Sequence, residues 1–449
     1  MKESLDLGVA SLSPLPGISR APGTWTGLIE KIAGRPFFRS DGLRTVLGPP
    51  QRVASPLADR CRDTVAHFNS FYEQVIRTYF EEPNRRAECL INPQFEQAIL
   101  ADKSPISLPL SRLDCVLTES GELKVIEINP VGVCTIHLQS VLYLARELER
   151  SGNAEDAALL LRFGAEQVAS FRRLYESQCA QPKERPTVGA LWLKDMYRPF
   201  RALLRATFHR FGWNYVEGLA TDVEISPTGM RVRGTPIDAL WGDFVFHLGY
   251  QYVRYRETKW PSRMGSFDAA PAQMSAIMGN PVALELFRSG KVVNVTPARA
   301  YVALSKHLLS WIDREDFPLQ KEEREWLRSH VAKTYDVAAR ARGLLSQREA
   351  MQRREELLLK PCQYGGSHGV QVGHSVSSAD WEKRLEAIWE DPNYVLQEFH
   401  MPCRARDGEL LSLGLYNYGG KLGGVTIRTG ADLVISARSA PLIAAVPID

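Results

Sequence analysis

Long apolar segments and strong net charge are both missing from this sequence. No apolar run approaches the roughly 18 residues that a membrane-spanning helix needs. The first residues, MKESLDLGVASLSPLPG, lack a basic region followed by an apolar core, which argues against a signal peptide. The formal net charge is only +3 over 449 residues. Neither a nucleic acid nor a membrane surface is therefore an expected partner.

Cysteine pairs at the spacing of metal or redox motifs are also missing. The seven cysteines are scattered, their number is odd, and none forms a CxxC pair. A zinc site or a disulfide framework is not expected, and a reducing cytoplasm is the expected compartment. The chain shows no Cys–His amidase motif either, which argues against a second, hydrolytic domain.

The hydrophobic share of 44% and the charged share of 24% are typical of a globular protein. A chain of this length predicts two to three domains. The changes of pattern along it divide the chain into an N-terminal arm and helical region, a hairpin with helices, a central α/β domain and a C-terminal lobe. The corresponding ranges are 1–105, 106–180, 185–290 and 291–449.

Hydrophobic periodicity predicts the elements of these parts. Residues 1 to about 50, rich in Pro, Gly and Ser, are expected to be irregular. Two apolar runs on either side of the turn residues 119–122 predict a β-hairpin. Helices are expected over 55–81, 137–150, 155–175, 198–211, 298–313, 319–347 and 381–390, with a solvated helix end over 348–356. Strands are expected over 113–118, 123–128, 187–193, 213–219, 237–246, 292–295, 357–360, 370–372 and 395–399. The strand–helix–strand order of the central part predicts a parallel sheet.

The predicted hairpin carries a candidate magnesium site. Side chains alternate along a strand, so Glu127 and Asn129 project to one face, and Asp114 on the neighbouring strand can project there too. Two carboxylates and an amide oxygen suit magnesium, which completes its shell with water and phosphates. Arg112, two residues before Asp114, would lie beside a terminal phosphate or an acyl phosphate. An exposed hairpin with ordinary polar residues is the alternative.

A candidate phosphate site follows about two hundred residues later. The apolar strand 357–360 ends in Lys360, whose burial is costly unless the ammonium meets an anion. The next residues include a glycine-rich loop whose N–H groups can form an anion-binding nest. Its candidate contacts are Gly365, Gly366, Ser367 and Gly369. The loop lacks the GKS or GKT ending of a P-loop and does not fit GxGxxG, which disfavours kinase-type and Rossmann sites.

Together these segments resemble the ATP-grasp ligases, and their reversed order resembles the circularly permuted, glutathionylspermidine synthase-like branch. The resemblance covers residues 106–135 and 236–430. It implies an α/β, circularly permuted ATP-grasp fold with a helical N-terminal part and a small central α/β domain. It further implies that the metal-binding hairpin and helices of 106–180 belong to the ATP-grasp core, that 185–290 is the substrate-side domain and that 291–449 is the nucleotide-binding lobe. The first hundred residues match no substrate pocket of the family.

The resemblance also implies roles for residues whose local pattern is weak. Lys306, after the strand Val292-Val293-Asn294, would reach an ATP phosphate. Gln397 and Glu398 would lie at the segment that joins the two lobes, where the backbone pairs with adenine and the acid reaches the ribose or the adenine amino group. Arg428 would be a catalytic arginine beside the acyl phosphate, with a sheet-edge arginine as the alternative. The cofactors implied are ATP and Mg²⁺.

These motifs predict an ATP- and Mg-dependent carboxylate–amine ligase that forms an amide or peptide bond through an acyl phosphate. The expected partners are a small-molecule carboxylate and an amine, of amino-acid, peptide or polyamine type. Transfer to a carrier-protein thiol and a non-catalytic nucleotide-binding scaffold remain alternatives, and a homodimer stays open. A basic run at Arg254, Arg256, Lys259 and Arg263 reads more readily as a solvated loop than as a docking site for a carboxylate.

Overall fold

The computed structural model describes most of the chain. The described residues are 18–20, 51–53, 55–131, 145, 148–150, 152, 154–179, 181–192, 198–242, 245–247, 249–250, 270–363, 367, 369–404, 408–435 and 442–447. The basic run from Arg254 to Arg263, the loop residues Gly365 and Gly366, and most of the expected helix 137–150 lie outside them. Within this part of the chain, no helix is long and apolar enough to cross a membrane.

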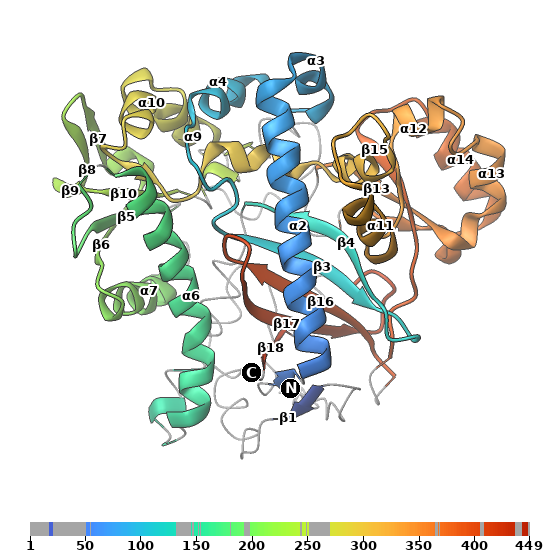
Figure 1. Cartoon of the computed structure of the whole chain (residues 1–449), viewed down its shortest axis with the longest axis horizontal. Helices are drawn as coiled ribbons and strands as arrows, with labels where there is room; N and C mark the ends of the chain where they lie inside the picture. The colour runs from blue at the N-terminus through green and yellow to red at the C-terminus, as the bar shows by residue number, and fades with distance from the viewer. Residues whose placement is uncertain are drawn as a thin grey trace, which may run out of the picture.

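A seven-stranded sheet forms the middle of the molecule (Figure 1). The expected hairpin is confirmed as an antiparallel pair, β3 and β4, and β3 also pairs with the C-terminal strand β16. Segments from opposite ends of the sequence therefore lie side by side. The strands, in sheet order, are β1 (Ile18–Arg20), β2 (Gln51–Val53), β18 (Leu442–Pro447), β17 (Leu422–Gly430), β16 (Leu410–Asn417), β3 (Ser111–Leu117) and β4 (Leu123–Asn129).

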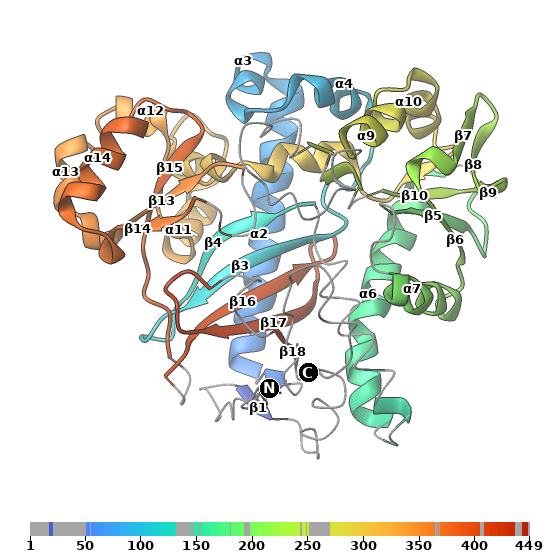
Figure 2. The same cartoon turned by 180° about the vertical axis from the view of Figure 1, so that it is seen from behind.

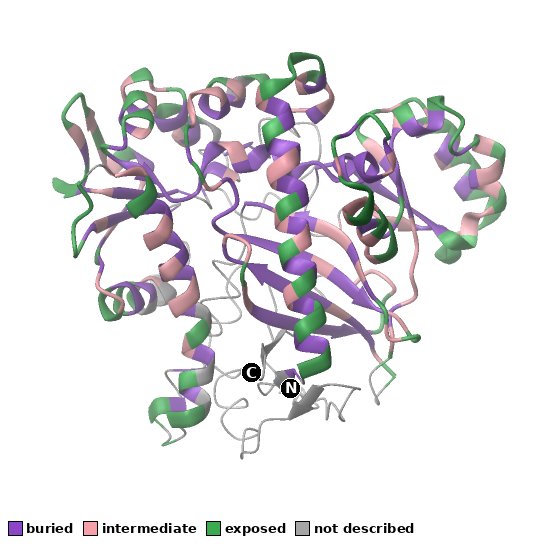
Figure 3. Cartoon of the chain, in the orientation of Figure 1, coloured by how far each residue is buried: buried purple, intermediate pink, exposed green. Residues whose placement is uncertain are grey.

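The long helix α2 (Ser55–Glu81) crosses one face of this sheet (Figure 1), and the other face is seen in Figure 2. Its apolar residues recur every three or four positions, and Val65, Phe68, Tyr72 and Val75 are fully buried. Figure 3 shows buried, intermediate and exposed residues alternating along the helix. Burying each large side chain contributes about 1.5–3 kcal/mol, which explains why the expected helix 55–81 forms at the bounds predicted.

The central unit is a four-stranded parallel sheet, as the strand–helix–strand pattern predicted. Gly189 in β5 has no room for a side chain, because a Cβ there would meet Ile237 Cδ1 at 2.9 Å. The sheet order is β11 (Val293–Asn294), β10 (Ala239–Trp241), β5 (Thr187–Leu191) and β6 (Asn214–Gly218), with α7 (Arg198–Arg210) between β5 and β6. A small antiparallel sheet joins it, made of β7 (Val223–Ser226), β8 (Gly229–Val232) and β9 (Thr235–Ile237).

The C-terminal lobe has a four-stranded antiparallel sheet and its own hydrophobic core, which includes Leu357, Leu359, Trp381 and Leu396. The lobe lies beside β4, where Val125 forms a bridge with Val331. Its strands, in sheet order, are β12 (Thr334–Tyr335), β15 (Tyr394–Glu398), β13 (Leu357–Pro361) and β14 (Gln371–Val372). Its helices are α12 (Val337–Ala341), α13 (Gln347–Gln352) and α14 (Ser378–Ile388).

The predictions of one continuous helix over 298–313 and of another over 319–347 are wrong. The range 298–313 forms two 3₁₀ segments, η6 (Ala298–Leu304) and η7 (Lys306–Asp313), separated by an extended Ser305. The range 319–347 is a helix, α11 (Lys321–His330), then strand β12, then α12. Tertiary pairing overrides helix propensity here, since Ala332 donates its N–H to Val125 and β12 pairs with β15. Asp336 then starts α12 by accepting a hydrogen bond from the Ala339 N–H.

The remaining elements complete the helical surroundings of the sheets. The expected helix 155–175 is confirmed as α6, and most of the others lie along the upper edge of the molecule in Figure 1. They are α3 (Pro83–Arg86), η3 (Ala87–Cys89), α4 (Pro93–Ala101), α6 (Ala154–Gln178), η4 (Ala220–Asp222), α9 (Ala270–Met278), α10 (Pro281–Arg288), η8 (Arg354–Glu356) and η9 (Gly373–Ser375).

Candidate functional site

A cavity of about 260 Å³ lies where the seven-stranded sheet meets the C-terminal lobe. Strands β3, β4 and β17 supply polar residues to it from one side, and η7, β13 and β15 supply others from the opposite side. Residues of the candidate magnesium site and of the candidate phosphate site, the two half-sites of the sequence, line this one cavity. The predicted site residues that line it are Arg112, Asp114, Glu127, Asn129, Lys306, Lys360, Ser367, Glu398 and Arg428.

The hairpin places its polar side chains as the strand alternation predicted. Asp114 lies opposite Glu127, and Arg112 lies opposite Asn129. The Arg112 guanidinium donates two hydrogen bonds to Asp114, from Nε to Oδ1 at 2.5 Å and from Nη2 to Oδ2 at 2.8 Å. The Asn129 amide donates to Asp114 Oδ2 at 3.2 Å. These side chains therefore form one connected network.

Asp114 is held in its charged form. Burial alone would raise the pKa of its carboxyl, but the charge and hydrogen bonds of Arg112 and the nearby Arg428 hold that pKa below its usual range. Arg428 Nη1 lies 3.9 Å from Asp114 Oδ2. Two guanidinium groups therefore lie beside the Asp114 carboxylate. Their combined positive charge exceeds the negative charge of this carboxylate.

Lys306 connects the later half of the sequence to the hairpin. Its Nζ lies 3.6 Å from Glu127 Oε2, and both side chains are largely buried. The main chain fixes this position, because the Lys306 N–H donates to the Cys362 carbonyl oxygen at 2.8 Å. The start of η7 is therefore anchored to the residue that follows the end of β13.

Lys360 reaches the hairpin from β13. Its ammonium donates to Gln397 Oε1 at 2.8 Å and to the Ile126 carbonyl oxygen at 3.2 Å. Burial lowers the pKa of this ammonium to about 8, against the opposing effect of Glu127. Within the part of the chain that the structure describes, its hydrogen-bond partners are neutral, so the buried positive charge is not neutralised by an ion pair.

Gln397 is not among the residues that line the cavity. Strand β15 lies between β12 and β13, so the backbone at Gln397 is flanked by Thr334 and Leu358. Its side chain donates to Thr334 Oγ1 at 2.9 Å and to the Ile126 oxygen at 3.2 Å. The expected pairing of this backbone with adenine is therefore not available at Gln397 itself, and its side chain contacts protein groups.

Glu398 lines the cavity but has a protein partner. Arg353 Nη2 lies 3.1 Å from Glu398 Oε1, and the Tyr335 hydroxyl donates to the same oxygen at 3.5 Å. Of the glycine loop, Ser367 lines the cavity, and both Ser367 and Gly369 have left-handed backbone, with φ of 61° and 70°. Gly365 and Gly366 lie outside the described residues.

Arg428 brings an incompletely satisfied guanidinium to the cavity. It lies on β17, opposite Ser412 of β16, and is 8% exposed. Burial and the neighbouring Arg112 lower the pKa of Arg428. Its buried Nε has no hydrogen-bond partner among the described residues. A buried donor of this kind is costly unless it meets an acceptor, and an anionic ligand would provide one.

Sequence reasoning missed two histidines of the cavity, His247 and His400. The Nδ1 of His247 is buried without a hydrogen-bond partner in the described residues. Burial and, secondarily, Lys306 lower the pKa of His247 to about 4, so the ring is neutral near pH 7. His247 directly follows the apolar run 237–246, and nothing in its local pattern marks it as a cavity residue.

The oxygen ligands of the hairpin fit magnesium only in part. The described residues hold no group of three or more His, Cys, Asp or Glu side chains that could bind a metal by themselves. Asp114 is occupied by Arg112, whereas Glu127 meets Lys306 at a looser 3.6 Å. The set therefore fits a magnesium ion that arrives with phosphate oxygens and water, with Glu127 and Asn129 as its nearest protein ligands.

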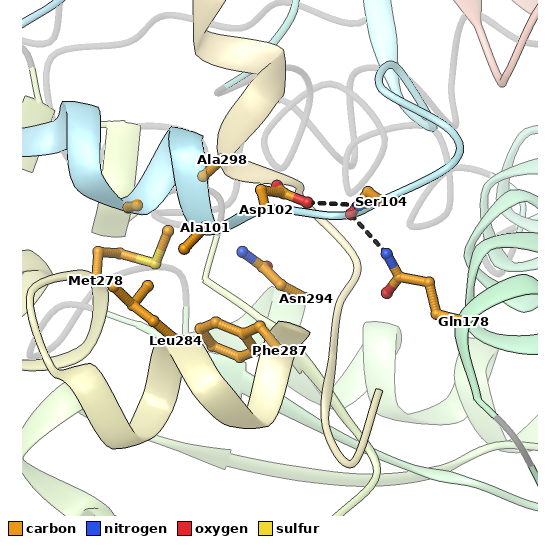
Figure 4. A pocket seen from close by; sticks show the side chains of 10 residues that line it. Ala101, Asp102, Ser104, Gln178, Met278, Leu284, Phe287, Asn294 and Ala298 are labelled. Atoms are coloured by element: carbon orange, nitrogen blue, oxygen red, sulfur yellow. Dashed lines mark hydrogen bonds between the residues drawn. The ribbon is translucent and has the colours of Figure 1, made fainter. Parts of the chain in front are cut away.

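A second, very small cavity lies beside the central parallel sheet (Figure 4). Its polar residues bond to one another, since Asp102 Oδ1 accepts the Ser104 N–H at 2.8 Å and Gln178 donates to Ser104 Oγ at 2.7 Å. Its volume of about 10 Å³ is close to the minimum for a single water molecule. It is therefore not a candidate ligand site.

Comparisons with known proteins give little further guidance. No protein-family model matches the chain, and no curated protein matches it. One similar solved structure is a provisionally named gamma-glutamylcysteine synthetase from Methylobacillus flagellatus KT, with 11% identity and a TM-score of 0.41. The similarity covers 83% of this chain and 84% of that one. A similarity of this size shows nothing about the activity of this chain.

Proposed function

We propose that the chain is an ATP- and magnesium-dependent ligase of the circularly permuted ATP-grasp type, which joins a carboxylate to an amine. The observation that carries the proposal is the junction of the two half-sites in one cavity. Lys306 approaches Glu127 at 3.6 Å, and Lys360 donates to the Ile126 oxygen at 3.2 Å. A triphosphate with its magnesium ion would supply an anion for Lys360, whose described hydrogen-bond partners are neutral, and a divalent cation for Glu127.

Each group has a role that follows from its charge and place. Lys306 and Lys360 bind phosphate oxygens, and Ser367, which lines the same cavity, contacts them as well. Glu127 and Asn129 hold magnesium, which offsets phosphate charge when it is bound. Arg112 on β3 and Arg428 on β17 would stabilise the charge on an acyl phosphate. Asp114 holds Arg112 in place through two hydrogen bonds.

The reaction follows from these roles. A substrate carboxylate oxygen attacks the γ-phosphorus, the bond to the β–γ bridging oxygen breaks, and ADP leaves. An amine then attacks the acyl carbon, its nitrogen loses a proton, and phosphate departs with the electron pair of the broken C–O bond. The products are an amide, ADP and phosphate. Positioning and charge neutralisation are sufficient, and no side-chain nucleophile is required.

Binding of a non-hydrolysable ATP analogue tests the proposal without knowledge of the substrates. We expect magnesium-dependent binding that Lys306→Met weakens strongly and that Lys321→Met leaves unchanged, because Lys321 is exposed and is not among the residues that line the cavity. Absence of binding by the unmodified chain would contradict the proposal. Once substrates are found, release of AMP and pyrophosphate in place of ADP and phosphate would contradict the acyl-phosphate route. A gain of mass on a carrier protein would show that the acyl acceptor is a thiol and not an amine.

A further inference from the structure

The side-chain amide of Gln397 links three parts of the fold. Its oxygen accepts a hydrogen bond from the Lys360 ammonium at 2.8 Å. Its nitrogen donates to Thr334 Oγ1 at 2.9 Å and to the Ile126 carbonyl oxygen at 3.2 Å. Because Lys360 also donates to that carbonyl oxygen, the lysine, the amide and the β4 backbone form a closed triangle of hydrogen bonds.

This triangle is largely buried in protein. Gln397 is 0% exposed, and Lys360, which also lines the cavity, is 4% exposed. Burial leaves little room for water to replace the amide oxygen, and an ammonium that loses this acceptor would move toward the cavity or lose its proton. The amide is the shorter of the two contacts that hold the ammonium, so it has the larger part in fixing the ammonium position.

We propose that Gln397 is a positioning residue for the phosphate chain of the nucleotide. It holds two of the three ammonium protons of Lys360 on neutral acceptors, directly through its own oxygen and indirectly by fixing the Ile126 oxygen, so that the third proton faces the cavity. This inference rests on the proposed function, because it assigns the anion that Lys360 meets to a nucleotide phosphate.

The same contacts tie the phosphate lysine to the metal-binding strand. Ile126 directly precedes Glu127 on β4, and its oxygen is the common acceptor of Lys360 and Gln397. If the C-terminal lobe moved relative to β4, the Ile126 oxygen would lose its hydrogen bonds from Lys360 and from Gln397 together. Gln397 thus sets the distance between the lysine that receives the phosphates and the carboxylate that receives the magnesium.

The test compares two probes, a non-hydrolysable ATP analogue with magnesium and adenosine alone, by titration calorimetry. Gln397→Met keeps the side-chain length and removes all of the amide hydrogen bonds. We expect it to weaken binding of the analogue about ten- to a hundredfold, the range for a hydrogen bond to a charged group, and to leave adenosine binding unchanged. A merely structural role would weaken both probes alike.

A double-mutant cycle with Lys360→Met makes the test sharper. If Gln397 acts through Lys360, the double variant binds the analogue no more weakly than Lys360→Met alone. Additive losses would overturn the inference, and so would unchanged analogue binding by Gln397→Met. The matched control is Gln178→Met, which removes a hydrogen-bonded glutamine beside the small cavity of Figure 4 and is expected to change neither affinity.

Two further provisions keep the outcome decisive. If Gln397→Met does not fold, Gln397→Asn replaces it, since the shorter side chain keeps a buried amide but withdraws its oxygen from Lys360. The same selective loss of analogue binding is expected, and unchanged analogue binding would overturn the inference. Failure of the unmodified chain to bind the analogue would instead contradict the proposed function, so the two failures are distinguishable.

Discussion

Lys306 lies 3.6 Å from Glu127, although the entire central α/β unit separates the two residues in the sequence. The pair joins η7 to β4 and places an ammonium beside the carboxylate that we propose as the principal magnesium ligand. Both side chains are largely buried, so the attraction between them is screened less than at the surface. This contact makes the cavity a single site with components from both halves of the chain.

Glu127→Ala is expected to abolish magnesium-dependent binding of the ATP analogue while the chain stays folded. The substitution removes the carboxylate that we propose as the magnesium ligand. Lys306 would then contact the phosphates without Glu127 beside it. Calorimetric titration with and without magnesium measures the effect, and Glu285→Ala, on the exposed face of α10, is the control. Magnesium dependence equal to that of the unmodified chain would show that the hairpin is not the metal site.

Arg112→Met is expected to destabilise the protein by about 3–5 kcal/mol, because it removes the main partner of the buried Asp114 carboxylate. The double variant Arg112→Met/Asp114→Asn should recover part of that loss, since no buried charge is then left without its partner. Urea unfolding of the three proteins measures this. Equal destabilisation by the single and double variants would contradict the assigned coupling.

Gly369→Ala tests the proposed phosphate contact of the segment that includes the cavity residues Ser367 and Val370. The backbone at this position has φ of +70°, and an added Cβ would lie 2.8 Å from Pro361 Cγ. Gly234→Ala, at φ of +72° with no atom within 4 Å, carries the backbone cost alone, about 1–2 kcal/mol. We expect both to lose stability in urea unfolding and only Gly369→Ala to lose affinity for the analogue. Equal affinity of the two variants would count against a phosphate contact by this loop.

His247 gives the protein a defined acid sensitivity. Its pKa of about 4 in the folded state lies below the ordinary value of 6.5, so the unfolded chain binds the proton more readily. Stability from the neutral ring is complete above pH 6.5 and is lost as the pH falls toward 4, by up to about 3 kcal/mol. His247→Gln should flatten this part of the pH dependence of urea unfolding. An unchanged slope between pH 6.5 and 4 would contradict the assignment.

The local sequence pattern was sufficient to predict the elements that bury a continuous apolar face. Helix α2 and the β3–β4 hairpin follow from spacing and turn residues, and the alternation along β4 correctly put Glu127 and Asn129 on one face. The parallel central sheet followed from the order of its elements. In each of these cases, the residues that decide the structure are close together in the sequence.

The sequence could not reveal features that depend on distant partners. The range 319–347 does not form one helix, because Val331–Thr334 pairs with β4 and β15. No local sequence pattern predicts that pairing. Gln397 was predicted to contact nucleotide, but its place in the middle of a sheet directs its amide to Lys360. His247 reaches the cavity only through the packing of the central unit. Each of these positions is set by contacts between segments that are far apart in the chain.

A crystal structure with magnesium and a non-hydrolysable ATP analogue tests the central claim most directly. We expect phosphate oxygens within hydrogen-bond distance of the Lys306 and Lys360 ammonium groups, about 2.7–2.9 Å. We also expect a magnesium ion within about 2.1 Å of a Glu127 oxygen. An analogue bound elsewhere on the molecule, or bound here with the two lysines pointing away from its phosphates, would contradict the claim that the two halves of the chain form one ATP site.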